Sequence, residues 1–266
     1  MTKSRPDLWG AFLKEADLKP HLSRYWLNAK YEDREVFDAQ VKTICDTYAQ
    51  ACALHEQGSH VVSTDEMTGI QALERLHPTK PAKPGFEERR EFEYIRHGTQ
   101  TLIANFEVAT GKVLTPSIGD TRTEMDFVEH IKKTIGLDPE AQWIFVCDQL
   151  NTHKSESLVR FVAEQCNIQE DLGVKGKSGI LKSIDTRTAF LICPSHRIRF
   201  VYTPKHASWL NQVEIWFSIL MRKLLRRASF TSKHDLAHRI LAFIDYFNAT
   251  MAKAFKWTYK GRPLAA

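Results

Sequence analysis

The chain has 266 residues, of which 43% are hydrophobic and 26% are charged. These proportions are those of a folded globular protein, and they exclude a disordered, collagen-like or disulfide-rich chain. The formal net charge of +5 permits a polyanionic partner without requiring one. No apolar run is long enough to span a bilayer. Five cysteines without a CxxC pair predict reduced thiols, as in the cytoplasm, and give no support for a zinc site or a disulfide framework.

The first quarter of the chain is predicted to be helical. Val41, Ile44 and Tyr48 recur at helical spacing within residues 1–57, and Gly58 then interrupts the pattern. A short β-branched strand is expected over residues 60–65. The proline-rich, charged residues 76–90 predict an exposed loop or surface arm.

The middle and end of the chain alternate between strand and helix patterns. A pair of strands is expected within residues 92–118, joined by a turn at residues 109–112. The remaining elements are a helix over 123–135 capped by Thr121 or Thr123, a strand over 143–147, a helix over 155–166, a mixed segment over 167–196, a strand over 198–202, and helices over about 207–227 and 232–250. The apolar run 143–147 is typical of a central strand buried on both faces. This order predicts an α/β fold with a mixed sheet flanked by helices.

Three carboxylates occupy positions at which such sheets bind ligands. Asp65 follows the first strand, Asp148 ends the apolar strand, and Glu214 lies at the edge of the apolar face of the helix after strand 198–202. Carboxylates so placed can bind Mg²⁺, and two such ions can promote phosphodiester chemistry. From these residues alone, an Asp that caps a turn and a Glu214 salt bridge with Arg197 or Lys205 are equally consistent interpretations.

Four segments carry a resemblance to a known family: STDEMTGIQ at 63–71, EYIRHGT at 93–99, VCDQLNTH at 146–153 and TPKHASWLNQVEIWF at 203–217. Over about residues 60–250 the sequence resembles the catalytic part of a bacterial insertion-sequence transposase of the mariner-like DDE superfamily. The resemblance implies an RNase H-like fold with Asp65, Asp148 and Glu214 as the metal-binding catalytic triad. It also implies two Mg²⁺ ions, with Mn²⁺ as a substitute, and a cytoplasmic, nucleoid-associated location in a bacterium.

The implied reaction is metal-dependent cleavage and strand transfer of DNA at transposon ends, with no covalent protein intermediate. The alternatives are an inactive or non-catalytic DNA-binding derivative and an RNase H-like nuclease without strand transfer. The implied partners are DNA, both transposon ends and target, and a second copy of the chain on that DNA.

Several polar and aromatic residues near the triad are candidates for DNA contact. Four cations within six residues form the clearest basic patch, which would give salt-sensitive binding, although a solvated helix end has the same pattern. The full candidate set is Arg96, His97, His153, Lys205, His206, Trp209, Asn211, Gln212, Arg222, Lys223, Arg226 and Arg227.

Two features depart from the family pattern. Gln149 stands where the family commonly has Asn, and Asp148 and Glu214 are about twice as far apart in sequence as is common. An insertion at about 167–195 accounts for that separation, either as a DNA contact or as a surface excursion.

The expected domains are a helical remnant of the DNA-binding region and linker at 1–57, the catalytic domain at 58–252, and a tail at 253–266. Because the family usually has two N-terminal helix-turn-helix units, we expect most of that module to be encoded separately or lost from this copy.

Overall fold

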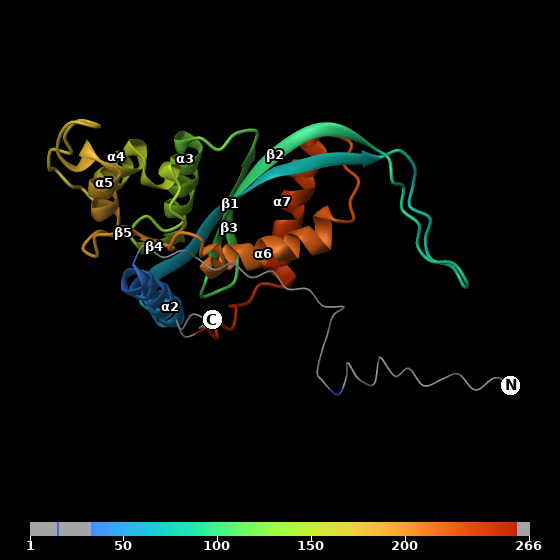
Figure 1. Ribbon diagram of the computed structural model, residues 1–266, viewed down its shortest axis with the longest axis horizontal. Coiled ribbons are helices and arrows are strands. Elements are labelled where there is room, and N and C mark those ends of the chain that lie inside the picture. The colour runs from blue at the N-terminus through green and yellow to red at the C-terminus, as the bar shows by residue number, and fades with distance from the viewer. Residues whose placement is uncertain (1–14, 16–32, 260–266) are drawn as a thin grey trace. The chain divides into compact units, whose positions relative to one another are not determined.

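The computed structural model describes residue 15 and residues 33–259, which include a five-stranded mixed sheet (Figure 1). The strand order is β3-β2-β1-β4-β5. Strands β1 and β2, and β2 and β3, pair antiparallel, whereas β1 and β4, and β4 and β5, pair parallel. The strands are β1 Ser59–Arg75, β2 Tyr94–Glu107, β3 Val113–Gly119, β4 Gln142–Cys147 and β5 Ile198–Tyr202. The predicted mixed sheet is confirmed, but the first strand is longer than predicted: β1 continues ten residues beyond Asp65, so Asp65 lies within the strand and does not follow it. The helical region expected before residue 33 lies outside the described residues.

Helices cover both faces of this sheet. They are α2 Arg34–Glu56, α3 Glu124–Ile135, α4 Glu156–Gln165, α5 Ile184–Leu191, α6 Gln212–Leu220 and α7 Lys233–Thr250. Figure 1 shows α3, α4 and α5 together on one side and α2 on the other. Helices α6 and α7 pack on the long β1–β2 ribbon through the core that contains Trp216 and Phe247.

Strand β4 is buried on both faces, as its continuous apolar run predicts. Trp143 and Phe145 belong to the core under α3, α4 and α5, whereas Ile144 and Val146 belong to the core under α2. This alternation follows from the two-residue period of a strand. The end of β4, and therefore Asp148, lies between the neighbouring strands β1 and β5.

Helix α2 belongs to the same compact unit as the sheet. The chain divides at residue 33, so the boundary expected at residue 57 does not separate α2 from the catalytic fold. Val41, Ile44 and Ala51 are fully buried against the sheet. The last described residues also pack on this unit, since Phe255 stacks on Phe106 and Trp257 contacts Tyr48 edge to face.

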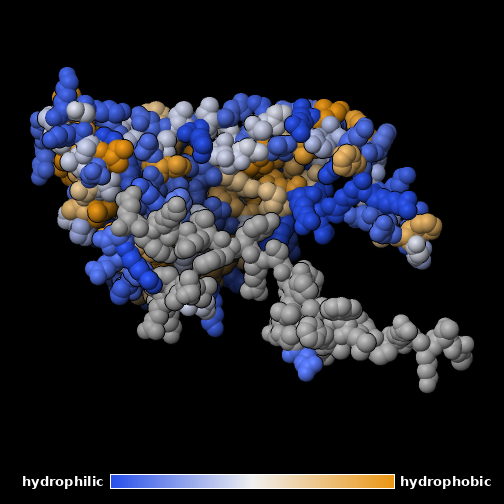
Figure 2. Space-filling view, in the orientation of Figure 1, coloured by the Kyte–Doolittle hydropathy of each residue, from blue (hydrophilic) through white to orange (hydrophobic). Residues whose placement is uncertain are grey.

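The prolines and charges at residues 76–90 form an arm beyond the ends of β1 and β2 (Figure 1). Residues 76–90 are exposed throughout, and isolated bridges join Lys80 to Arg89 and Lys83 to Phe86. The arm is mainly hydrophilic in Figure 2. The prediction of a surface arm is confirmed.

Two expectations from the sequence need correction. The segment 167–195 is not a mere surface excursion, because it contains α5, and Leu181 and Leu191 are fully buried in the core beside β4. The single helix expected over 207–227 is a 3₁₀ turn, Ser208–Leu210, then α6, then a π-helical turn, Met221–Leu225. In that last turn the Arg226 amide donates to the Met221 carbonyl, five residues back.

Candidate active site

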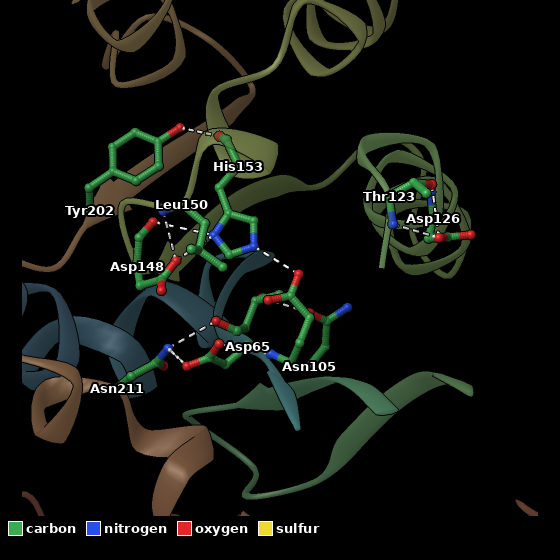
Figure 3. Close-up of polar contacts among 11 residues, drawn as sticks. Asp65, Asn105, Thr123, Asp126, Asp148, Leu150, His153, Tyr202 and Asn211 are labelled. Atoms are coloured by element: carbon green, nitrogen blue, oxygen red, sulfur yellow. Dashed lines mark hydrogen bonds and ion pairs between the residues drawn. The ribbon is translucent and has the colours of Figure 1, made fainter. Parts of the chain in front are cut away.

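The three predicted carboxylates come from three elements that meet at one edge of the sheet. Asp65 lies on β1, Asp148 follows β4, and Glu214 is in the first turn of α6. The parallel register pairs Ser63 with Val146, so Asp65 and Asp148 are at the same level on neighbouring strands. Figure 3 shows Asp65 and Asp148 near one another, with Asn211 beside Asp65. The structure therefore brings the predicted triad to one place.

The carboxylates of this site repel one another, and burial adds to the cost of their charge. Asp65 is only 7% exposed, and burial, with the charges of Asp148, Glu66 and Glu214, raises its pKa to about 7 although the Glu66 amide donates to it. Burial and the charge of Asp148 also raise the pKa of Glu214. Within the described part of the chain, neither Arg197 nor Lys205 forms an ion pair with Glu214. Three carboxylates, two of which have no cationic partner among the described residues, suit a hard divalent cation.

His153 is the positive partner of two carboxylates. Its side chain is fully buried, with Nδ1 2.8 Å from Asp148 Oδ1 and Nε2 3.0 Å from Glu66 Oε1. Burial opposes a charge on the ring, but hydrogen bonds to Asp148, Cys147 and Glu66 raise the pKa of His153 well above its usual range. Burial likewise opposes ionisation of Asp148, and His153 outweighs it, so the pKa of Asp148 is lowered. The DNA contact expected from His153 is therefore wrong for this structure, since no part of its side chain reaches solvent.

Asn211 connects the start of α6 to β1. Its amide donates to the carbonyl of Thr64 at 2.9 Å and to Asp65 Oδ2 at 3.2 Å, and its Oδ1 accepts from the Ser63 hydroxyl. The Ser63 hydroxyl in turn accepts from the amide of Val213 at 2.9 Å. Asn211 thus sets the position of both Asp65 and the helix that carries Glu214 (Figure 3).

Asn211 and Gln212 are fully buried. The DNA contacts expected from these two amides are therefore also wrong, because α6 turns them toward β1 and the protein interior. Asn211 holds the start of the helix in place through its hydrogen bonds to β1.

Gln149 has a structural role at the ends of β4 and β5. Its Nε2 donates to the Thr203 carbonyl at 2.9 Å, and its Oε1 accepts from Lys154 Nζ at 3.1 Å. The longer side chain that departs from the family pattern therefore spans two strand ends next to Asp148.

The other candidate residues surround the carboxylates on the surface. Lys205, His206 and Trp209 are exposed in the loop and 3₁₀ turn before α6. A cleft of about 520 Å³ runs beside Glu214 and is lined by Glu66 and Arg222 among others.

The cations of the basic patch gather beyond that cleft. Arg222, Arg226 and Arg227 line one pocket of about 470 Å³ together with Arg90 from the arm. Lys223 lines an adjoining pocket with Arg222 and Arg227. The patch is thus a concave cationic surface that begins about two turns after Glu214.

Arg96 and His97 lie on β2, away from the pocket of arginines. Arg96 is exposed and donates to the Tyr94 hydroxyl at 3.0 Å. His97 Nε2 is 2.7 Å from Glu74 Oε2, which ties the side chain to β1.

Glu66 and Tyr48 are site residues that sequence reasoning missed. Glu66 pairs with His153 across 87 positions, and Tyr48 donates to the Leu210 carbonyl at the start of α6. Glu66 could have been found from its place directly after Asp65. Strand neighbours point to opposite faces, so Glu66 cannot face the same side as Asp65 and needs its own partner.

Comparison with known proteins agrees with this geometry. The family model described as DDE superfamily endonuclease matches residues 60–237. The fold is similar to Mos1 transposase in its paired-end complex with left transposon end (TM-score 0.53, 14% identity) and to the Mos1 mariner paired end complex with Mn (TM-score 0.55, 13% identity). Each match covers 94% of this chain and 65% of the other, so the chain spans about two thirds of those proteins' length. A comparison with curated protein sequences gives no match.

None of the helices in the described part of the chain is both long and apolar enough to cross a membrane.

Proposed function

Since the chain belongs to the DDE superfamily endonuclease family, we propose that it is a transposase catalytic domain that cleaves DNA and transfers strands at transposon ends. The observation that carries this proposal is the triad itself: Asp65, Asp148 and Glu214 converge from β1, β4 and α6, and burial together with charge repulsion raises the pKa of both Asp65 and Glu214. The RNase H-like arrangement shared with Mos1 supports the same conclusion.

The cofactor we propose is a pair of Mg²⁺ ions held by Asp65, Asp148 and Glu214, with Mn²⁺ able to replace them. When bound, such ions make the attacking oxygen a better nucleophile and stabilise the leaving oxygen. The all-carboxylate donor set fits this cofactor, and the Mos1 paired end complex in the comparison contains Mn. The three carboxylates do not all lie within 4.8 Å of one another in residues 33–259, so shared ions would draw them together.

The chain's own residues prepare this site. His153 holds a proton between Glu66 and Asp148 and so keeps Asp148 ionised and oriented toward the triad. Asn211 donates to Oδ2 of Asp65, and the Glu66 amide donates to Oδ1. These two hydrogen bonds fix the orientation of the Asp65 carboxylate. Neither His153 nor Asn211 reacts with substrate; both set the geometry of the carboxylates.

DNA is the proposed partner, held by the exposed cations next to Glu214. The concave surface of Arg90, Arg222, Arg226 and Arg227 offers cations that suit a phosphate backbone, and such contacts fix position without reading sequence. Lys205, His206, Trp209 and, further away, Arg96 and His97 extend this proposed surface. We further propose a homodimer on DNA, a separately encoded helix-turn-helix segment that reads the ends, and a location at the bacterial nucleoid.

The test uses DNA that carries the terminal repeats of the element, with Mg²⁺ or Mn²⁺. Wild type should release cleaved ends and join them to target DNA, and Asp148→Asn should give neither product. Asp245→Asn, which changes an exposed acid on α7, is the matched control and should behave as wild type. Equal product from Asp148→Asn and wild type would contradict the catalytic assignment. Cleavage without joining would favour a nuclease instead.

A further inference from the structure

A second group of metal-ligating side chains lies at the start of β1, five positions before Asp65. His55 is in the last turn of α2, His60 is the second residue of β1, and Glu107 is the last residue of β2. Five residues separate His60 from Asp65, or about 16 Å along a strand at about 3.3 Å per residue. This group is therefore spatially separate from the carboxylate triad.

The ligand atoms of these three residues converge. Among the described residues, they are the only group of three His, Cys, Asp or Glu side chains whose ligand atoms all lie within 4.8 Å of one another. His60 Nδ1 is 2.6 Å from Glu107 Oε1, and His55 Nδ1 is 3.6 Å from the same oxygen. Both imidazoles thus direct Nδ1 toward one carboxylate oxygen.

The surrounding residues hold two of these ligands in place. The His60 ring stacks on Trp143 with centroids 4.1 Å apart, and its Nε2 is 3.5 Å from Asp138 Oδ2. The side chain of Glu107 is 5% exposed, and its second oxygen accepts from the Thr110 hydroxyl. A histidine that offers one nitrogen to a metal commonly gives the other to a carboxylate, which is the relation between His60 and Asp138.

The contact of His55 Nδ1 with Glu107 is long, at 3.6 Å, and is not a hydrogen bond. The bond between His60 and Glu107 leaves His55 Nδ1 buried and without a hydrogen-bond partner. A cation between the three side chains would satisfy this nitrogen and the carboxylate together.

We propose that His55, His60 and Glu107 bind a Zn²⁺ ion, with water as the fourth ligand. Two imidazoles and one carboxylate favour zinc over magnesium, which prefers oxygen ligands. Tetrahedral bonds of about 2.0 Å place ligand atoms about 3.3 Å apart. The observed 2.6 Å would therefore open, and the observed 3.6 Å would close, each by less than 1 Å. The ion joins α2, β1 and β2, so its role is to stabilise the fold and not to act on DNA.

The proposal is tested by zinc titration of the full chain carrying Asp65→Asn and Asp148→Asn, so that the acidic site does not take up the ion. This protein should bind one Zn²⁺ per chain and show a raised Tm, since binding to the folded state alone stabilises it. Adding His55→Ala should lower the zinc affinity at least 100-fold and abolish the Tm increase. Because Nδ1 of His55 makes no hydrogen bond, its removal should leave the fold intact, which circular dichroism checks.

The matched control is His97→Ala in the same background, because His97 pairs with Glu74 but belongs to no group of three ligands in the described residues. It should bind zinc as its parent does. Unchanged zinc affinity in His55→Ala would overturn the proposal. A second measurement does not depend on any variant at the proposed site: Co²⁺ added to the Asp65→Asn, Asp148→Asn protein should give the intense visible absorption of a tetrahedral site with nitrogen ligands. Only weak octahedral bands would overturn the proposal as well.

Discussion

The segment from His60 to Asp65 of strand β1 carries different ligand chemistry at its two ends. At one end, Asp65 meets Asp148 and Glu214, so the donors are all oxygen and their charges repel. At the other end, His60 meets His55 and Glu107, where one carboxylate is shared by two imidazoles. The first set requires cations to balance its charge and suits hard ions, whereas the second has less charge and suits zinc. One strand therefore presents two sites whose metal preferences should differ.

Histidines also have opposite roles at the two ends. His153 lies between two carboxylates and is held in its protonated form, so it supplies charge to the catalytic end. A zinc ligand must instead be neutral, and His55 and His60 would have to lose any proton on Nδ1. The following predictions test whether the two ends are independent and whether their chemistry differs as described.

The largest expected effect is the loss of DNA cleavage when Asp148 at the acidic site is changed, but not when His55 at the histidine site is changed. Asp148→Asn removes an oxygen that we propose binds the metal, and it should lower the cleavage rate roughly 10³-fold, equivalent to about 4 kcal/mol of transition-state stabilisation. His55→Ala should change that rate less than about threefold, because His55 lies on α2 beside His60, at the opposite end of the segment from Asp65. A kinetic assay on end-containing DNA measures both. A comparable loss in the two variants would show that the ends are coupled.

Replacing the buried charge partner should affect stability most. His153→Ala leaves Glu66 and Asp148 facing each other, with Glu66 buried, and should cost about 3–5 kcal/mol of unfolding free energy. His97→Ala breaks a partly exposed pair with Glu74 and should cost about 1 kcal/mol or less. Urea denaturation at neutral pH without metal compares the two. Similar losses would mean that His153 does not carry the charge described here.

The acidic end should also be recognisable from its pH dependence. Asp65 has an ordinary pKa of 3.8 and a folded-state pKa of about 7, so the folded protein holds a proton that the unfolded chain releases between those values. Stability is therefore lost as the pH rises from about 4 to 7. Asp65→Asn should raise the unfolding free energy of the metal-free protein by at most about 4 kcal/mol at pH 8, with no gain below pH 4.

Denaturant titrations at several pH values measure this effect, with Asp245→Asn as the control that should stay within about 0.5 kcal/mol of wild type. Addition of Mg²⁺ at pH 8 should stabilise wild type more than Asp65→Asn. A pH-independent effect of Asp65→Asn would show that Asp65 is already ionised at low pH.

The smallest expected effect concerns the cations beside the acidic end. Arg222→Ala with Arg226→Ala should weaken DNA binding and reduce the slope of log affinity against log salt by about 0.9 for each phosphate that the variant no longer neutralises. Lys132→Ala with Lys133→Ala removes two exposed cations on α3 and should leave the slope unchanged. Equal slopes in the two double variants would remove the pocket of arginines from the proposed DNA surface.

The sequence allowed the sheet to be predicted from local patterns, whereas the three carboxylates stand out by position and are interpreted as a triad through the family resemblance. The apolar run that ends at Asp148 defines a doubly buried strand, and the motif at 203–217 leads directly to Glu214. The contact between Glu66 and His153 could not be predicted, since it joins residues far apart in sequence and depends on the side of β1 that each acid faces.

Burial explains the remaining differences. Asn211 and Gln212 have the chemistry of a DNA contact, but the start of α6 turns them inward. Helix α5 escaped prediction because its apolar residues do not follow one helical face, although Ser183 and Thr186 form a capping box at its start. The group of His55, His60 and Glu107 has no local sequence motif, because three separate elements supply its ligands.

The contact between Trp257 and Tyr48 closes the compact unit on itself, since residues near its end touch its first helix. Tyr48 in turn donates to the Leu210 carbonyl, four residues before Glu214. Tension on the C-terminal segment would therefore pass through two side chains to the helix that carries a catalytic acid. Anything attached to that end of the chain, or pulling on it within a larger assembly, would have a short mechanical route to the active site.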